Sequence, residues 1–150
     1  MKIEDIAYNA QPKEVLEIQK ELIALYYREL FEKEIYLEQM RKLEGDIVEI
    51  LKRIELQEEK HAELLMILLS KANVEVPKYI PKVPLSKINA PIAVAVEYDV
   101  EQEEISSEKY LEIIEKASPN LKQFLKYILY EEYAHIKILQ EYLGESVMKK

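Results

Sequence analysis

The sequence predicts an all-α fold in which two antiparallel helical hairpins are joined by a long proline-rich crossover. Apolar residues recur at intervals of three and four along most of the chain, which is the spacing of one helix face. Only two glycines occur in 150 residues, which favours long helices with few turns. Most of the prolines cluster near the middle of the chain. A chain of this length suits one domain, so we expect a single four-helix bundle over residues 1–150.

The first helix is expected over about residues 12–43. Pro12 suits a first helical turn, because its missing N–H group is not needed there. Two carboxylates, Glu29 and Glu32, interrupt the apolar face of this helix. The segment around Gly45 ends it. The apolar face carries Val15, Ile18, Leu22, Leu25, Tyr36, Met40 and Leu43.

The second helix is expected over about residues 46–71. Its apolar face is also interrupted near the middle, here by Glu58 and His61. The apolar positions are Ile47, Ile50, Ile54, Leu65 and Leu68. Both predicted helices of the first half therefore place polar groups on an inward face.

Residues 72–91 form the crossover, because Pro77, Pro81, Pro84 and Pro91 prevent a regular helix there. About 18 residues in extended or polyproline form reach roughly 55 Å, whereas a 25-residue helix is only about 38 Å long. The linker is therefore long enough to cross the whole bundle and return the chain to its opposite end.

The third helix is expected over about residues 90–117. Val94, Val96, Tyr98 and Val100 alternate as in a strand, so a strand remains an alternative for this segment. The helical interpretation places on one face Ile92, Val96, Val100, Glu103, Ser106, Tyr110, Ile113 and Ala117.

The fourth helix is expected over about residues 120–144, after Pro119 has ended the third. Its inward face includes two polar residues, Glu132 and His135. The apolar positions on this face are Phe124, Leu125, Ile128, Leu139 and Leu143.

Composition excludes several classes of protein. A formal net charge of −8 argues against binding to nucleic acid or to an anionic membrane, since both need surplus Lys and Arg. The absence of cysteine excludes a disulfide scaffold, a cysteine-ligated zinc or iron–sulfur site and an in-chain rubredoxin module. Any metal must therefore be held by oxygen and nitrogen. The sequence contains no apolar run long enough to span a membrane and no apolar signal region, so we expect a cytoplasmic protein.

The chain contains only two histidines, and each follows a glutamate by three residues. These pairs are Glu58 with His61 and Glu132 with His135. Residues three apart share one face of a helix, so a carboxylate and an imidazole in this spacing can bind one metal ion. A single pair is a weak signal, because glutamate is abundant in this chain.

The two halves of the chain repeat a longer pattern without gaps, at a shift of 74 residues. Counting back 25 and 32 residues from each histidine reaches a tyrosine and a glutamate in both halves. These are Tyr36 and Glu29 in the first half, and Tyr110 and Glu103 in the second. Residues 22–69 and 96–143 are identical at 13 of 48 positions, which indicates an internal duplication.

Antiparallel hairpins would bring the repeated residues together. The midpoint between Glu29 and Glu58 falls at the turn near Gly45, and the midpoint between Glu103 and Glu132 falls at the second turn. Each pair therefore lies level across its hairpin, about 14 residues or roughly 21 Å from the turn. Two hairpins related by a pseudo-twofold axis would line one buried site with four glutamates and two histidines.

This pattern resembles that of the ferritin-like di-iron carboxylate proteins over residues 15–143. In that family, one glutamate from each of two helices and a Glu-x-x-His motif from each of the other two project into a four-helix bundle. The resemblance implies a ferritin-like four-helix bundle with an internal pseudo-twofold repeat. The metal ligands that it implies are Glu29, Glu58, His61, Glu103, Glu132 and His135.

In detail the chain is most similar to the rubrerythrin or erythrin branch, without a rubredoxin domain. That branch has a tyrosine about two turns after the ligand glutamate, and Tyr36 and Tyr110 occupy this place. It also has a seventh ligand three residues after one ligand glutamate, a spacing that Glu32 has here. In rubrerythrins the seventh ligand lies in the second half, where this chain has Ser106. The hairpins are also shorter here than is usual in the family.

Charge balance favours an occupied metal site. Four buried carboxylates cancel two divalent ions, and without metal they would face a large cost of desolvation and repulsion. Glu32 adds a fifth charge that suits an oxidised pair, so we expect it to bind in the ferric state and to shift on reduction. Carboxylates mixed with imidazoles suit iron or manganese better than a closed zinc site. We expect two iron ions per chain, or a mixed iron–manganese pair.

Each of these residues also has an ordinary structural interpretation. The glutamates could be solvated or salt-bridged, and the histidines could be core residues held by hydrogen bonds. Tyr36 and Tyr110 could bind site carboxylates or simply fill the core. Gln57 and Glu131 each precede a Glu-x-x-His motif by one residue, and could be outer hydrogen-bond partners of the ligands.

The resemblance implies a di-iron oxidoreductase active in oxidative stress, which reduces hydrogen peroxide or oxidises Fe(II) with peroxide or oxygen. A separate protein would donate electrons, because the chain has no cysteine for a rubredoxin module. Alternatives are an iron-storage ferritin-type protein and a non-catalytic bundle that binds a partner, and related enzymes hydroxylate quinones, tRNA or hydrocarbons. We expect a homodimer from a second apolar stripe formed by Ile23, Tyr26, Tyr27, Leu30 and Leu37.

Overall fold

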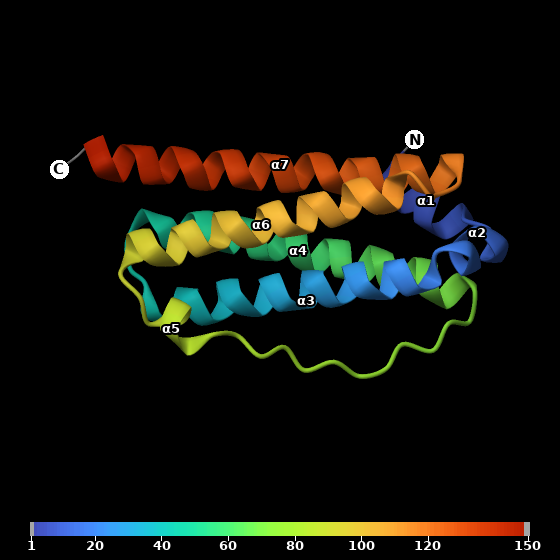
Figure 1. Cartoon of the computed structure of the whole chain (residues 1–150), viewed down its shortest axis with the longest axis horizontal. Coiled ribbons are helices and arrows are strands. Elements are labelled where there is room, and N and C mark those ends of the chain that lie inside the picture. Colours follow the sequence, from blue (N-terminus) through green and yellow to red (C-terminus); the bar gives the residue numbers. More distant parts are fainter. Residues whose placement is uncertain (1, 149–150) are drawn as a thin grey trace.

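The computed structural model describes residues 2–148 and is all-helical over that range (Figure 1), which confirms the predicted fold class. Four long helices lie side by side, and three short helices accompany them. The long helices are α3 (Gln19–Lys42), α4 (Asp46–Lys71), α6 (Ile92–Ile114) and α7 (Pro119–Met148). The short helices are α1 (Ile3–Asn9), α2 (Pro12–Glu17) and α5 (Leu85–Ile88). Within residues 2–148, none of the helices combines the length and apolar character that crossing a membrane requires.

The long helices pack as two antiparallel pairs, α3 with α4 and α6 with α7 (Figure 1). Gly45 lies in the first turn with a φ of 92°, a backbone conformation that other residues rarely adopt. At the second turn, the Ser118 hydroxyl accepts a 3.4 Å hydrogen bond from the N–H group of Leu121 and caps α7. The same hydroxyl donates a 2.8 Å hydrogen bond to Glu14 of α2. Both turns lie where the sequence predicts them.

The prediction of one helix over residues 12–43 is wrong, because the chain bends at Ile18 (φ −130°, ψ 32°) and divides into α2 and α3. The bend turns α2 across the end of the long helices, where Val15 is fully buried against the same apolar cluster as α4. The helix α1 precedes it and packs on α4 and α7. Helical spacing alone did not reveal the bend, because Val15 before it and Leu22 after it are both buried and stay in helical phase.

The crossover runs along α3 from the end of α4 to the start of α6 at the opposite end of the molecule (Figure 1). Two contacts attach it to α3. The Tyr27 hydroxyl donates a 2.7 Å hydrogen bond to the carbonyl of Pro77, and the Tyr27 ring stacks on Tyr79 with ring centroids 4.7 Å apart. The expectation that this segment lacks regular helix needs one correction, since α5 forms a single turn that buries Ile88.

The segment with strand-like alternation is helical, so the strand alternative is wrong. Helical packing buries Val96 and Val100, four residues apart, and leaves Val94 39% exposed. Packing of this face against neighbouring helices overrides the β-propensity of the valines. The predicted ends also shift, since the third helix spans 92–114 and the fourth spans 119–148.

The core consists of two apolar clusters with polar residues between them. On α3, Leu25 belongs to one cluster and Tyr36 to the other, while Glu29 and Glu32 lie between them. In each of the other long helices, buried polar residues likewise lie between residues of the two apolar clusters. The buried polar layer is therefore held between two well-packed apolar layers.

Candidate metal centre

All seven predicted ligand residues are buried at the middle of the molecule, each at most 2% exposed. Helix periodicity places them there, since each lies on the inward face that its helix also lines with buried apolar residues. Four helices contribute to the centre. The residues are Glu29 and Glu32 from α3, Glu58 and His61 from α4, Glu103 from α6, and Glu132 and His135 from α7.

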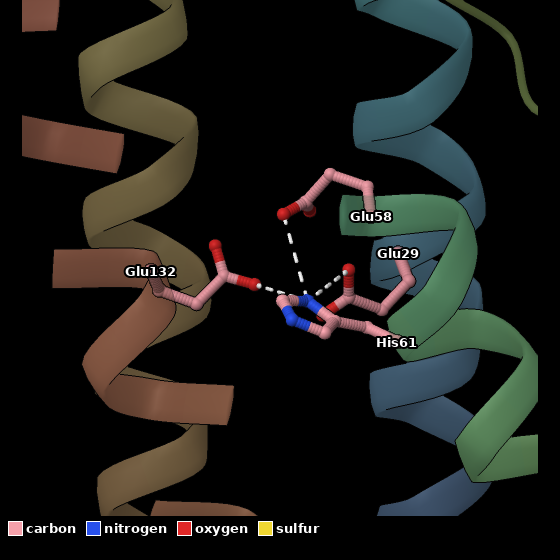
Figure 2. A group of neighbouring side chains, drawn as sticks. All are labelled: Glu29, Glu58, His61 and Glu132. Carbon is pink, nitrogen blue, oxygen red and sulfur yellow. Dashed lines mark ion pairs between the residues drawn. The ribbon is translucent and has the colours of Figure 1, made fainter. Parts of the chain in front are cut away.

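Six of these residues form two overlapping groups that could each hold a metal ion. Within each group, one oxygen or nitrogen atom per residue lies within 4.8 Å of the others. The first group is Glu29, Glu58, His61 and Glu132 (Figure 2), and the second is Glu58, Glu103, Glu132 and His135. Glu58 and Glu132 belong to both groups, whereas each group has its own second glutamate and its own histidine.

In the first group, three carboxylates surround Nδ1 of His61 (Figure 2). This atom lies 3.5 Å from Oε2 of Glu29, 3.7 Å from Oε1 of Glu58 and 3.5 Å from Oε1 of Glu132. Ligand atoms about 2.1 Å from an ion in ordinary geometry lie about 3.0–3.4 Å from one another. The observed spacing is therefore close to that of a coordination shell.

In the second group, Nδ1 of His135 lies 3.2 Å from Oε1 of Glu58, 3.4 Å from Oε1 of Glu103 and 3.7 Å from Oε2 of Glu132. Glu132 therefore turns Oε1 toward His61 and Oε2 toward His135. A carboxylate that bridges two metal ions presents its two oxygens in this way.

Unsatisfied polar atoms support a cation at this centre. Each of the six grouped residues has at least one buried oxygen or nitrogen atom without a hydrogen-bond partner in the part of the chain that the structure describes. Buried polar groups in folded proteins are nearly always hydrogen-bonded, and a bound ion would satisfy these. The atoms are Oε2 of Glu29, both oxygens of Glu58 and Glu132, Oε2 of Glu103, and Nδ1 of both histidines.

Outer hydrogen bonds orient the two imidazoles. Nε2 of His61 lies 2.8 Å from Oε1 of Glu131, and Nε2 of His135 contacts Oε1 of Gln57. Because both partners present acceptor oxygens, each Nε2 acts as the donor, and a ring that gives up its other proton to bind a cation presents its lone pair at Nδ1, toward the centre. The structure thus places Gln57 and Glu131 as outer partners, each on the histidine of the other helical pair.

The two predicted tyrosines orient the two unshared glutamates. The Tyr36 hydroxyl donates a 2.6 Å hydrogen bond to Oε1 of Glu103, and the Tyr110 hydroxyl donates a 2.7 Å bond to Oε1 of Glu29. Burial, and then the facing carboxylates, raise the pKa of both tyrosines well above 10, so both hydroxyls remain protonated donors. Of the two interpretations left open for these tyrosines, hydrogen bonding to site carboxylates is the one observed, and both rings are also buried.

Glu32 lies outside both groups. Its Oε1 accepts hydrogen bonds from the Ser106 hydroxyl and from Nη2 of Arg28, the latter at 3.3 Å. Burial, and then the charge of Glu103, raise the pKa of Glu32 to about 8. Its contacts therefore occupy one oxygen and leave Oε2 without a hydrogen-bond partner among residues 2–148.

The electrostatics of the centre favour exchange of protons for a cation. Burial, followed by the facing Glu103, raises the pKa of Glu58 and of Glu132 well above the usual range. Burial also raises the pKa of Glu29, but His61 outweighs this effect and holds it at about 2. Burial lowers the pKa of His61, yet Glu29 and Glu131 raise it to about 9. Without a cation, the shared carboxylates therefore hold protons that a metal ion would replace.

Several polar residues near the centre escaped sequence analysis. Arg28 reaches from α3 to the carbonyl and side-chain oxygens of Gln102 on α6, at 3.0 Å each. Asp99 is fully buried one turn before Glu103, and burial raises its pKa well above the usual range although Gln39 opposes the shift. The helical spacing of Asp99 and Glu103 was a usable signal, whereas nothing in the sequence indicated where Arg28 points.

Comparisons of this chain with protein-family models, with curated proteins and with solved structures find no match. The 74-residue repeat and the geometry of the centre are therefore the observations that bear on function. The buried Glu and His groups could hold a metal ion, and the reciprocal contacts between the two helical pairs keep them in place.

Proposed function

We propose that this protein is a ferritin-like di-iron protein, similar to rubrerythrin in its ligand pattern, that reduces hydrogen peroxide or oxidises Fe(II) with peroxide or oxygen. The observation that carries the proposal is the pair of ligand groups that share Glu58 and Glu132. Two metal ions a few Å apart require shared ligands of this kind. A mixed iron–manganese pair would use the same ligands.

The proposed architecture is a ferritin-like four-helix bundle in which a pseudo-twofold axis relates the two antiparallel pairs. The repeat in the sequence supports it, and so do reciprocal contacts between the pairs. Tyr36 binds Glu103 while Tyr110 binds Glu29, and residues 36 and 103 correspond in the repeat to 110 and 29. The residues bound to the two histidines, Glu131 and Gln57, also correspond.

The protein would hold two ions through its own groups. Glu29 with His61 and Glu103 with His135 would each bind one ion, and Glu58 and Glu132 would bind both. Four carboxylates would balance the charge of two divalent ions, and Glu32 would add a negative charge beside the oxidised pair. When bound, iron would supply the change of oxidation state that reduction of peroxide requires.

The surrounding residues would keep the ligands oriented. The tyrosine hydroxyls each hold one oxygen of an unshared glutamate, and the outer acceptors hold the protonated Nε2 of each histidine. The apolar clusters on both sides would limit the access of water and large reductants. Electrons for a peroxidase would then come from a separate donor protein.

We also propose a homodimer. Part of the second apolar stripe is already used within the chain, since Ile23 and Tyr26 pack on the core and Tyr27 contacts the crossover. The remaining stripe residues, Leu30 and Leu37, are half-buried. Size-exclusion chromatography would test this state, because a ferritin-type cage would elute as a particle of hundreds of kilodaltons and a dimer would not.

Metal content and reactivity test the proposed function together. We expect about two iron ions per chain after anaerobic loading with Fe(II), measured by mass spectrometry, from the two ligand groups. Peroxide should then produce a ferric absorbance band within the mixing time of a manual experiment. Glu132→Ala is the control variant, since it removes a ligand from both groups and should lose both iron ions and the band. Failure of the native chain to bind iron would overturn the proposal and favour a metal-free bundle that binds a partner.

A further inference from the structure

A hollow of about 310 Å³ opens beside the metal centre, between α3, α6 and the crossover. This volume lies at the lower end of the range for small-molecule sites, about 300–1,000 Å³. Three separate segments of the chain build it, which distinguishes it from a groove along a single pair of helices. It is lined by Ala24, Tyr27, Arg28, Phe31, Tyr79 and Lys109.

Aromatic rings form much of the lining. Tyr27 and Tyr79 are stacked with their ring centroids 4.7 Å apart, and the hydroxyl of Tyr27 is fixed by its bond to Pro77. The guanidinium carbon of Arg28 lies 5.3 Å from the centroid of the Phe31 ring. Rings held in this way present flat, apolar surfaces that suit a planar ligand.

The charge of the lining is unusual for this chain. Two of the six lining residues, Arg28 and Lys109, are cationic and none is acidic, although the whole chain carries a formal charge of −8. The side chain of Arg28 is only 17% exposed, so its charge is partly shielded from solvent. A partly buried arginine and a lysine that line the same hollow favour an anionic ligand such as a carboxylate.

The repeat indicates that the residues lining the hollow are not duplicated in the chain. The six grouped metal-centre residues are conserved between the halves, but the positions that line the hollow are not. Tyr27 corresponds to Glu101 and Arg28 to Gln102. Phe31 corresponds to Ile105, and Lys109 to Ile35. Each of these four residues is therefore replaced at the position that corresponds to it in the repeat. The residues that line the hollow are thus not part of the duplicated set of candidate metal ligands.

Arg28 connects the hollow to the metal centre. Its Nε donates a 3.1 Å hydrogen bond to the Ser106 hydroxyl, and its Nη2 lies 3.3 Å from Oε1 of Glu32. Glu32 is buried on α3 three residues after the grouped ligand Glu29. A ligand that pairs with Arg28 would therefore compete with Glu32 for the same guanidinium.

We propose that this hollow binds a small aromatic carboxylate, with the carboxylate paired to Arg28 and Lys109 and the ring packed against Tyr27, Phe31 and Tyr79. The rings suit the aromatic part of such a ligand, the two cations suit its carboxylate, and the volume suits a small molecule. The site does not depend on bound iron, so its test is separate from that of the proposed function.

Benzoate is a suitable probe, and the full chain is titrated with it after treatment with a chelator. We expect saturable binding with a Kd of about 1 mM, typical of a ligand this small. Binding should move the NMR signals of the Arg28 side-chain N–H group and of the Tyr27 and Tyr79 rings. Benzamide lacks the charge and cyclohexanecarboxylate lacks the aromatic ring, so each should bind about tenfold more weakly.

Arg28→Gln introduces the residue that the second half of the chain has at the equivalent position, and it should raise the Kd for benzoate at least tenfold. Tyr79→Ala, in the crossover, should weaken binding several-fold without altering a contact to Glu32. The matched control is Arg53→Gln on α4, which lines a different hollow and should leave the Kd unchanged. Equal binding of benzoate and benzamide, or an unchanged Kd in both Arg28→Gln and Tyr79→Ala, would overturn the proposal.

Discussion

The hydroxyl of Tyr36 on α3 donates a 2.6 Å hydrogen bond to Oε1 of Glu103 on α6. This bond joins two helices that belong to different antiparallel pairs. It occupies one oxygen of the carboxylate, while Oε2 lacks a hydrogen-bond partner in the described part of the chain. Tyr36 therefore orients Glu103 and leaves its second oxygen available to a cation.

Tyr36→Phe should destabilise the metal-free protein by about 1–3 kcal/mol, because it leaves a buried carboxylate oxygen unsatisfied. Tyr110→Phe should have a similar effect through Glu29. Urea unfolding followed by circular dichroism measures both changes. Tyr127→Phe is the matched control, since Tyr127 is 44% exposed and its change should stay within about 0.5 kcal/mol. If Tyr36→Phe and Tyr110→Phe lowered the free energy of unfolding no more than Tyr127→Phe does, the two buried tyrosines would not hold the site carboxylates as described.

Shared and unshared ligands should differ in how many ions their loss removes. Glu132→Ala takes a ligand from both groups, so it should abolish binding of both ions, whereas Glu103→Ala should remove one ion first. Metal content after anaerobic loading, measured by mass spectrometry, distinguishes the two results. Glu104→Ala is the matched control, because this neighbouring side chain is exposed. Equal stoichiometry in Glu132→Ala and Glu103→Ala would contradict a bridging role for Glu132.

The metal-free protein should lose stability as the pH rises from about 4.5 to 9. Folding raises the pKa of Glu32 from 4.5 to about 8 and that of His61 from 6.5 to about 9, and raises the pKa of Glu58 and Glu132 in the same direction. The folded state therefore binds more protons than the unfolded state in this range, and the free energy of unfolding falls with pH. Glu29, whose pKa is lowered to about 2, opposes this trend only below pH 4.5.

Thermal unfolding at pH 5, 7 and 9, with chelator and with excess Mn²⁺, measures this dependence. Metal should raise the Tm most at high pH, because the ion replaces protons on the shared glutamates. A Tm of the chelated protein that increased steadily from pH 5 to 9 would show that these carboxyls do not hold protons in the folded state.

The outer partners of the histidines should tune metal affinity. Gln57→Ala and Glu131→Ala should each weaken Mn²⁺ binding about 10–100-fold, since the imidazole loses the acceptor that fixes its orientation. The repeat supplies conservative variants for comparison. Gln57→Glu and Glu131→Gln each introduce the residue of the other half and keep an acceptor, so they should recover most of the affinity. Competition with a fluorescent chelator measures all four. No difference between the Ala and conservative variants would refute this role.

Much of the fold could be predicted because helical periodicity is a local property. The four long helices, both turns and the proline-rich crossover follow from residue spacing and from Gly45 and the prolines. The bend at Ile18 could not be predicted, because both flanking turns of helix have apolar residues in helical phase. The short helix α1 was also missed, since seven residues give too little periodicity and its burial depends on α4 and α7.

The arrangement of the site was only partly accessible from the sequence. The repeat identified six residues that the structure brings into two groups, because equal offsets in two hairpins place side chains at one level. It did not show that Glu32 would contact Arg28 and Ser106, because those contacts depend on the distance between α3 and α6. The repeat aligns Arg28 with Gln102, but only the packing of α3 beside α6 shows that Arg28 donates a hydrogen bond to Gln102.

By itself, the sequence determined the helical class, the positions of the long helices and the inward faces that carry the candidate ligand glutamates and the two histidines. These follow from the 3.6-residue period along a continuous segment. The tertiary structure decided that Glu58 and Glu132 are shared between two groups and that Tyr36 orients Glu103. These relationships depend on distances and angles between helices that are far apart in the chain, and only the packing of side chains in the core sets them.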